Sequence, residues 1–165
     1  DLVKEFAQGL KGHIDCVVGL DSRGFLFGPL MAVELAVPFV PVNLKIFKKD
    51  YSVSYSGLFQ IRKKGKLPGQ CTGVSYDLEY GSASVELQSN AFEFCQKGSS
   101  SSKARILVVD DLMATGGTMK AACDVLNAHV EAEVTHAFVV MELAFLQGKS
   151  QLPSSVNYHS LISYE

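Results

Sequence analysis

The chain has 165 residues and a mass of 17.9 kDa; 47% of its residues are hydrophobic, 19% are charged, and its net charge is −2. This composition excludes a disordered polymer, a collagen-like repeat and a polar linker. The near balance of charge also excludes a global field that would recruit nucleic acid or an anionic membrane. A chain of this length buries a sizeable core, so we expect a single domain over residues 1–165.

The predicted elements begin with an amphipathic helix over residues 2–11 that ends near Gly12. Three short apolar runs without alternation predict strands that are covered on both faces: residues 15–20, residues 105–109, and a run within residues 134–143. A helix is expected between the last two, over residues 118–128. Strands that alternate with helices predict an α/β fold with a central, mostly parallel sheet flanked by helices on both faces.

The apolar stretch from Phe25 to Val42 carries a single charge and three prolines, Pro29, Pro38 and Pro41. The prolines argue against one membrane-spanning helix, so we expect a buried helix followed by a buried strand. The four cysteines form no Cys-x-x-Cys pair and no cluster with histidine at metal-ligand spacing. This pattern indicates reduced thiols in a cytoplasmic protein.

Three further segments are expected outside the central sheet. Residues 84–88 alternate between apolar and polar, which predicts a half-exposed strand. Residues 45–60 mix basic and aromatic side chains; single-stranded nucleic acid could use such a segment, but a surface loop is the plainer interpretation. Residues 98–102 form a Gly-Ser tract, which is flexible by composition and chemically inert.

The segment from Val108 to Thr118 carries the strongest chemical signal. Its strand delivers two adjacent carboxylates, Asp110 and Asp111, to the edge of the sheet where ligands bind in open α/β folds. A tight turn of small residues and a helix N-terminus follow, and both can bind a phosphate. The carboxylates would repel a phosphate but would accept hydrogen bonds from ribose hydroxyls, so the motif fits a ribose 5-phosphate. The alternative is a purely structural Gly-rich turn.

Four segments resemble the type I phosphoribosyltransferases, and among them the members that act on adenine. They are Val108–Thr118, Gly19–Gly28, the pair Lys64–Gly69 and Ser75–Gly81, and Leu161–Glu165. The resemblance implies transfer of a phosphoribosyl group from 5-phosphoribosyl diphosphate (PRPP) to adenine, giving AMP and diphosphate in purine salvage. It further implies a cytoplasmic homodimer and a Mg²⁺ ion held mainly by PRPP and water, with no metal ligand assigned to protein side chains.

The turn Asp21-Ser22-Arg23 resembles the family's diphosphate-binding loop, whose peptide bond at this position is strained and often cis. Arg23 offers charge-assisted hydrogen bonds to the diphosphate, and Gly24 permits a close backbone approach. The alternative is a structural arginine paired with a surface acid.

The basic run at residues 62–66 is usually a solvated loop in isolation. The resemblance places Arg62 and Lys66 at positions that contact PRPP. It also places Glu79 as the acid/base near the purine N7 and Tyr80 beside it, in a loop over residues 72–81 that closes on the substrate. An exposed loop acid is the alternative for Glu79.

The implied catalytic residues are Glu79, Arg23 and Lys66. The implied substrate-binding residues come from the diphosphate turn, the basic run, the closing loop and the phosphate loop: Asp21, Ser22, Arg62, Tyr80, Asp110, Asp111, Ala114, Thr115, Gly116, Gly117 and Thr118.

The chain also departs from the family pattern in two places. A hood segment that reads the base would precede Asp1, and an insertion of roughly 20 residues falls at about residues 43–60, where long surface insertions cost little loop entropy. The sequence therefore leaves two alternatives open: a PRPP-binding relative that is regulatory or catalytically impaired, and a phosphoribosyltransferase for a 6-oxopurine.

Overall fold

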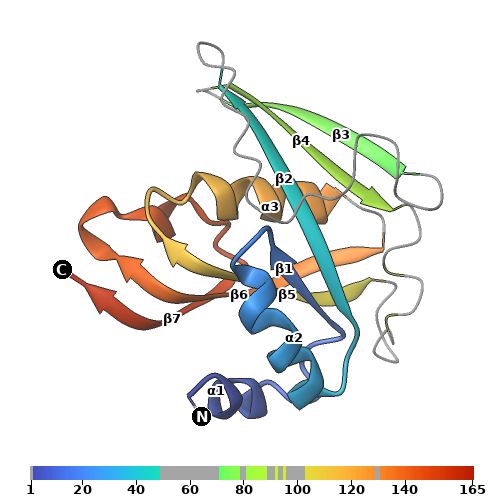
Figure 1. The fold of residues 1–165 in the computed structure, drawn as a ribbon, viewed down its shortest axis with the longest axis vertical. Coiled ribbons are helices and arrows are strands. Elements are labelled where there is room, and N and C mark those ends of the chain that lie inside the picture. The colour runs from blue at the N-terminus through green and yellow to red at the C-terminus, as the bar shows by residue number, and fades with distance from the viewer. Residues whose placement is uncertain are drawn as a thin grey trace.

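The computed structural model describes residues 2–48, 71–78, 81–88, 92, 95, 103–128 and 131–165. Seven strands form one sheet with the order β3-β4-β2-β1-β5-β6-β7 (Figure 1). Their bounds are β1 Cys16–Leu20, β2 Phe39–Lys48, β3 Cys71–Leu78, β4 Gly81–Gln88, β5 Ala104–Met113, β6 Ala132–Leu143 and β7 Asn157–Tyr164.

The five strands β2, β1, β5, β6 and β7 run parallel to their neighbours, as the apolar runs predict. The alternating segment at residues 84–88 belongs to β4, which lies antiparallel to β2 and extends the same sheet beyond its parallel part. The prediction of a mostly parallel central sheet is therefore confirmed, with an antiparallel extension at one side.

Two loop predictions are wrong in part. Residues 45–48 continue β2 and pair with β4 as far as Lys48 opposite Gly81, so the segment expected to be a loop from residue 45 begins as a strand. Cys71–Leu78 is strand β3, where a closing loop was expected over residues 72–81. Thr72, Val74, Tyr76 and Leu78 alternate with small or polar residues, a pattern that indicates a strand.

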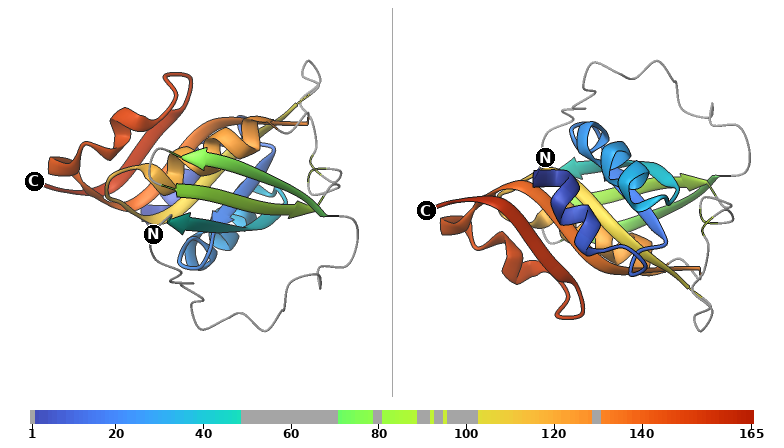
Figure 2. Two further views of the ribbon diagram at one scale, coloured as in Figure 1. Left: turned by 90° about the horizontal axis from the view of Figure 1, so that it is seen from above. Right: turned by 90° about the horizontal axis from the view of Figure 1, so that it is seen from below.

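Helices cover both faces of the parallel strands (Figure 2, left). Helices α1 (Leu2–Gly9) and α2 (Gly24–Leu35) lie on one face, and α3 (Gly117–Ala128) lies on the other. Successive residues of β1 alternate between the two cores: Val17 packs with α1 and α2, whereas Cys16 and Val18 pack with α3. This is why the run reads as continuously apolar.

Helix α1 ends at Gly9, three residues before the expected stop. Gly12 instead lies in the turn that follows, with a φ of 78° that favours glycine. Phe6 packs the helix against the sheet, since its ring centroid lies 4.7 Å from that of Phe138 and 4.4 Å from that of His159.

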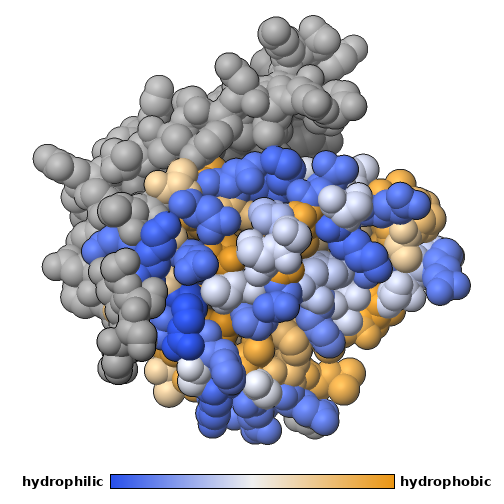
Figure 3. All heavy atoms as spheres, turned by 180° about the vertical axis from the view of Figure 1, so that it is seen from behind, coloured by the Kyte–Doolittle hydropathy of each residue, from blue (hydrophilic) through white to orange (hydrophobic). Residues whose placement is uncertain are grey.

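Helix α2 is only half buried, which corrects the expectation of a buried helix. Its inner side packs Met31 and Leu35 against the sheet, but Leu26, Leu30 and Val33 are 66%, 55% and 80% exposed. These three residues, spaced at about one turn, form what we call the α2 face. By contrast, the surface seen from the α3 side is mostly hydrophilic where it is described (Figure 3). In the described part of the chain, no helix has the length and apolar character needed to cross a membrane.

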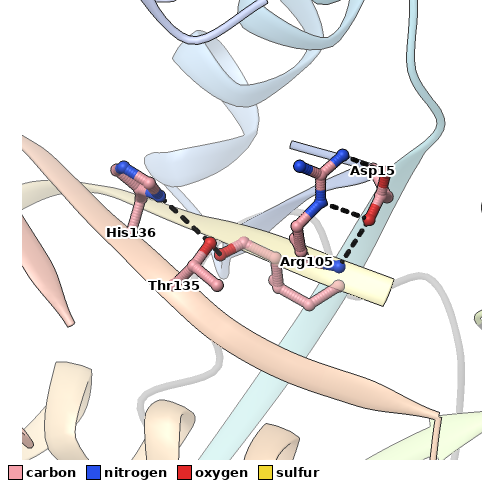
Figure 4. Close-up of polar contacts among 5 residues, drawn as sticks. Asp15, Arg105, Thr135 and His136 are labelled. Carbon is pink, nitrogen blue, oxygen red and sulfur yellow. Dashed lines mark hydrogen bonds and ion pairs between the residues drawn. The ribbon is translucent and has the colours of Figure 1, made fainter. Parts of the chain in front are cut away.

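An ion pair joins the amino ends of β1 and β5 (Figure 4). Arg105 donates from Nε to Asp15 Oδ2 at 2.9 Å and from one terminal nitrogen to Oδ1 at 2.8 Å. The backbone N–H of Arg105 also donates to Oδ2 at 2.8 Å. Asp15 is buried and Arg105 is partly exposed, so this arrangement holds the two strands together through a buried carboxylate.

Candidate functional site

The candidate site lies where β5 extends beyond β1. Pairing between the two strands ends at Gly19 opposite Val109, whereas β5 continues beside β6 through Asp110 to Met113. Asp110 and Asp111 therefore lie in the last part of β5, at the carboxyl edge of the sheet, as predicted. Crevices outside this edge are where open α/β sheets bind ligands.

Gly24 brings the turn that follows β1 against β5. A Cβ atom at this position would overlap the carbonyl oxygen of Val109, so only glycine allows the two backbones to approach so closely. The sequence predicts that Gly24 allows a ligand to approach the backbone, whereas in the structure it allows β5 to approach. The start of α2 is therefore held against Val109, the residue before Asp110.

Arg23 and Asp111 form an ion pair across the site. The guanidinium donates to Asp111 Oδ2 at 2.9 Å, and this bond raises the pKa of Arg23. The Arg23 side chain is 69% exposed and that of Asp111 is 27% exposed. Arg23 therefore does pair with an acid, as the alternative predicts, but that acid is Asp111, which itself belongs to the predicted site. The two motifs are 88 residues apart in sequence, and no local pattern indicates this contact.

The pKa of Asp110 is raised to about 7, and burial is the largest cause. The bond from the Asp111 backbone N–H to Asp110 Oδ1, at 2.9 Å, and the positive charge of Arg23 lower this value, whereas the negative charge of Asp111 adds to the increase. Asp110 therefore exchanges its proton near neutral pH. A ligand that donates hydrogen bonds to the carboxylate would favour its ionised form.

The turn at residues 21–23 leads directly into α2. The peptide bond between Asp21 and Ser22 is cis, as the resemblance implies. The Asp21 N–H donates to Val42 O at 3.0 Å and thereby joins the turn to β2. Burial raises the pKa of the Asp21 carboxyl.

The predicted phosphate loop runs from Ala114 to the start of α3 at Gly117. Gly116 has a φ of 87°, which glycine adopts without strain, and its carbonyl accepts the Lys120 N–H at 2.9 Å as the helix begins. Thr115, Gly117 and Thr118 are exposed. The free amides and positive dipole end of a 12-residue helix therefore face solvent beside the two carboxylates.

The structure thus brings the diphosphate turn, the carboxylate pair and the phosphate loop to one edge of the sheet. Arg62, Lys66, Glu79 and Tyr80 lie outside the described residues. Across the ranges that the structure describes, no group of three or more His, Cys, Asp or Glu residues is arranged to hold a metal ion.

Comparison with known proteins agrees with this geometry. Residues 1–160 match the family model described as "Phosphoribosyl transferase domain". The adenine phosphoribosyltransferase of Caenorhabditis elegans is 44% identical over 164 residues, which cover 99% of this chain and 73% of that protein.

Two solved structures extend the likeness to the fold. The adenine phosphoribosyltransferase of Rhodothermus marinus is 32% identical, with a TM-score of 0.71 and coverage of 99% of this chain and 78% of that one. The Saccharomyces cerevisiae enzyme, complexed with an imino-altritol bisphosphate and adenine, is 36% identical, with a TM-score of 0.66 and coverage of 97% and 77%. The chain therefore belongs to the phosphoribosyltransferase family, on its adenine phosphoribosyltransferase branch.

Proposed function

We propose that this chain transfers the phosphoribosyl group of PRPP to adenine and releases AMP and diphosphate, a reaction of purine salvage. The observation that carries the proposal is the meeting of Asp110 and Asp111 with the phosphate loop and the Arg23 turn at one sheet edge. The choice of adenine rests on relatives that are 44% and 36% identical, of which the yeast enzyme holds adenine.

The phosphate loop, residues 114–118, binds the 5-phosphate in this proposal. Its support is the exposed start of α3, where the first amides of the helix have no partner within the helix. Thr115 and Thr118 add hydroxyl donors to the same surface. A phosphate bound here places the ribose near the end of β5.

Asp110 and Asp111 orient the ribose by accepting hydrogen bonds from its hydroxyls. They also favour the positive charge that develops at C1 as the bond to diphosphate breaks. Because the pKa of Asp110 lies at about 7, hydroxyl donors from the ribose would shift it towards its ionised, accepting form.

Arg23, together with Ser22 and Asp21, binds the diphosphate group. Arg23 must leave its bond to Asp111 to do so, and the cost is small because exposed ion pairs contribute only about 0–1 kcal/mol. The release of Arg23 would also free the Asp111 carboxylate for the ribose. Substrate binding thus exchanges one ion pair for contacts with the diphosphate and the ribose of PRPP.

Mg²⁺ fits this group of oxygen donors, because it prefers oxygen ligands and keeps several waters. The ion would be held mainly by PRPP and water, with Asp110 and Asp111 nearby as acceptors for the ribose hydroxyls. When bound, the ion neutralises charge on the diphosphate as it leaves.

Four residues outside the described ranges complete the proposal through the family resemblance. Arg62 and Lys66 contact PRPP, and Lys66 acts with Arg23 on the leaving diphosphate. Glu79 is the acid/base near N7: it takes up the imidazole proton that adenine loses as N9 bonds to C1 and the bond from C1 to diphosphate breaks, and Tyr80 borders the base. General acid–base catalysis of this kind accelerates reactions by roughly 10²–10⁴-fold.

The test is incorporation of radiolabelled adenine or hypoxanthine into nucleotide with PRPP and Mg²⁺. We expect AMP from adenine and little product from hypoxanthine; preference for hypoxanthine would identify a 6-oxopurine enzyme instead. Glu79→Gln should lower turnover by about 10²-fold or more without a matching loss of PRPP affinity by calorimetry. PRPP binding without turnover in the parent chain would identify a binding relative.

We also propose that the chain is a cytoplasmic homodimer. The α2 face offers an apolar surface of the kind that protein interfaces cover. The cytoplasmic location rests on the cysteine pattern, and three of the thiols, Cys16, Cys95 and Cys123, are buried. Sedimentation of the purified chain tests the dimer, since a monomer at micromolar concentration would contradict it.

A further inference from the structure

The segment that follows β6 packs behind the phosphate loop. It consists of two 3-10 turns, η1 (Ala144–Leu146) and η2 (Gly148–Gln151), joined by Gln147 with a φ of 52°. The Gln147 carbonyl accepts bonds from the Ser150 N–H at 3.0 Å and from its hydroxyl at 2.8 Å. The segment is therefore internally ordered and presents a defined surface to the loop.

Gly148 lies in direct backbone contact with the phosphate loop. A Cβ atom at Gly148 would overlap the carbonyl oxygen of Ala114 and lie 2.8 Å from the backbone nitrogen of Gly116. A Cβ atom at Gly116 would in turn overlap the carbonyl oxygen of Gly148. Both glycines are buried. The two backbones meet with no room for a side chain on either, so the position of one sets the position of the other.

Lys149, the next residue, fastens this segment to the sheet. Its ammonium lies 3.7 Å from Oε1 of Glu142, which is buried at the end of β6. The hydroxyl of Ser160 on β7 donates to the other carboxylate oxygen at 3.2 Å. Within the described part of the chain, Glu142 Oε1 has no hydrogen bond; the Lys149 ammonium supplies a positive charge beside it, and the Tyr158 hydroxyl also lies near this carboxylate. Contacts from β6 and β7 thus reach Lys149 through Glu142, and Lys149 is adjacent to Gly148 in the chain.

We propose that Gly148 is a positioning residue for the 5-phosphate, and that the Lys149–Glu142 pair holds it against the phosphate loop. Gly148 does not touch the ligand; it limits the conformations of residues 114–116, whose backbone shapes the phosphate site. The inference rests on the proposed function, since it assigns a support to that site. A displacement of about 1 Å in such a loop can cost on the order of 10²-fold in activity.

Gly148→Ala tests the proposal through two probes that bind at different parts of the site. Calorimetry with ribose 5-phosphate reports on the phosphate loop, and calorimetry with inorganic diphosphate and Mg²⁺ reports on the Arg23 turn. We expect about 10–100-fold weaker binding of ribose 5-phosphate, with diphosphate affinity unchanged. Gly9→Ala is the matched control, because a Cβ atom there meets nothing within 4 Å, and it should bind both probes like the parent.

The outcomes separate the inference from the proposed function. Failure of the parent chain to bind ribose 5-phosphate would overturn both. Parent binding with equal affinity in Gly148→Ala would overturn the positioning role alone.

If Gly148→Ala binds neither ribose 5-phosphate nor diphosphate and shows no thermal unfolding transition, the variant has not folded, and a second variant tests the positioning role. Lys149→Met changes an exposed side chain and should weaken ribose 5-phosphate binding several-fold without affecting diphosphate, and Lys149→Arg should restore it. Unchanged ribose 5-phosphate affinity in Lys149→Met would then overturn the proposal.

Discussion

The two ends of the β1–β5 strand pair carry the same chemical groups in opposite arrangements. At the amino end, Arg105 and the buried Asp15 share two guanidinium hydrogen bonds. At the carboxyl end, the exposed Arg23 reaches Asp111 through one hydrogen bond, and the pKa of the adjacent Asp110 is raised to about 7. One end is closed by its own side chains, and the other leaves carboxylate oxygens available for a ligand.

The difference shows how one pair of strands separates stability from function. A bidentate pair on a buried carboxylate holds the strands together and is costly to break. A single exposed bond contributes little to stability and can be exchanged for substrate. Two carboxylates placed side by side are unfavourable in the absence of a ligand, and such strain is expected where binding is the purpose. Four substitutions test this contrast, from the largest expected effect to the smallest.

Arg105→Met removes the guanidinium from the buried Asp15 and should lower the free energy of unfolding by about 3 kcal/mol. Urea unfolding at neutral pH measures the loss. The double variant Asp15→Asn with Arg105→Met should recover part of it, because the buried charge is then absent. A loss below about 1 kcal/mol would contradict a stabilising role for the closed end.

Asp111→Asn at the open end should weaken ribose 5-phosphate binding by about 10–100-fold, since a hydrogen bond to a charged group contributes about 1.5–3 kcal/mol. The free energy of unfolding should change by less than about 1 kcal/mol, because Arg23 is already exposed to water. Calorimetry and urea unfolding of the same preparation check both statements. A large loss of stability with unchanged affinity would reverse the assignment of the two ends.

Asp110→Asn should stabilise the protein at alkaline pH. The ordinary pKa of the carboxyl is 3.8 and its folded value is about 7, so between these values the folded state keeps a proton that the unfolded chain has released. The carboxyl therefore lowers stability as pH rises through this window, whereas an amide does not titrate. The stability advantage of the variant over the parent should be about 2–3 kcal/mol larger at pH 8 than at pH 5. A gain that is equal at both pH values would contradict the shift.

Asp124→Ala is the control for the effect on stability of an exposed ion pair that lies away from both ends of the β1–β5 pair. Asp124 accepts a bond of 2.6 Å from Lys120 one turn earlier on α3. Exposed pairs at this spacing contribute about 0.3–0.5 kcal/mol, so thermal unfolding should shift only slightly. A loss as large as that of Arg105→Met would remove the distinction between buried and exposed pairs.

The parallel core was predictable because its signals are local. The apolar runs at residues 15–20 and 105–109 and the helix over residues 118–128 each carry their own pattern, and the structure confirms them with small shifts of boundary. The carboxylates and the phosphate loop were found for the same reason, since one continuous segment places them together. Strand β3 was not predicted, because its segment of residues 72–81 mixes Ser, Tyr and Gly in a way that is also typical of loops.

The contacts between segments were not predictable from sequence. Nothing near Arg23 indicates that its partner is Asp111, and nothing near Gly116 indicates that Gly148 lies against it. The exposure of Leu26 and Leu30 was not predictable either. A leucine in the core and a leucine on an uncovered apolar face look the same in the sequence. Such features depend on which surfaces the folded chain brings together.

The α2 face has a consequence for regulation by mass action. Helix α2 starts immediately after Arg23, so a partner that covers Leu26, Leu30 and Val33 also restrains the diphosphate turn at the start of the helix. Association and diphosphate binding are then thermodynamically linked, and each changes the other by the same factor. If the proposed dimer holds the turn in the conformation that binds diphosphate, affinity would rise with protein concentration, and dilution alone would act as an inhibitor.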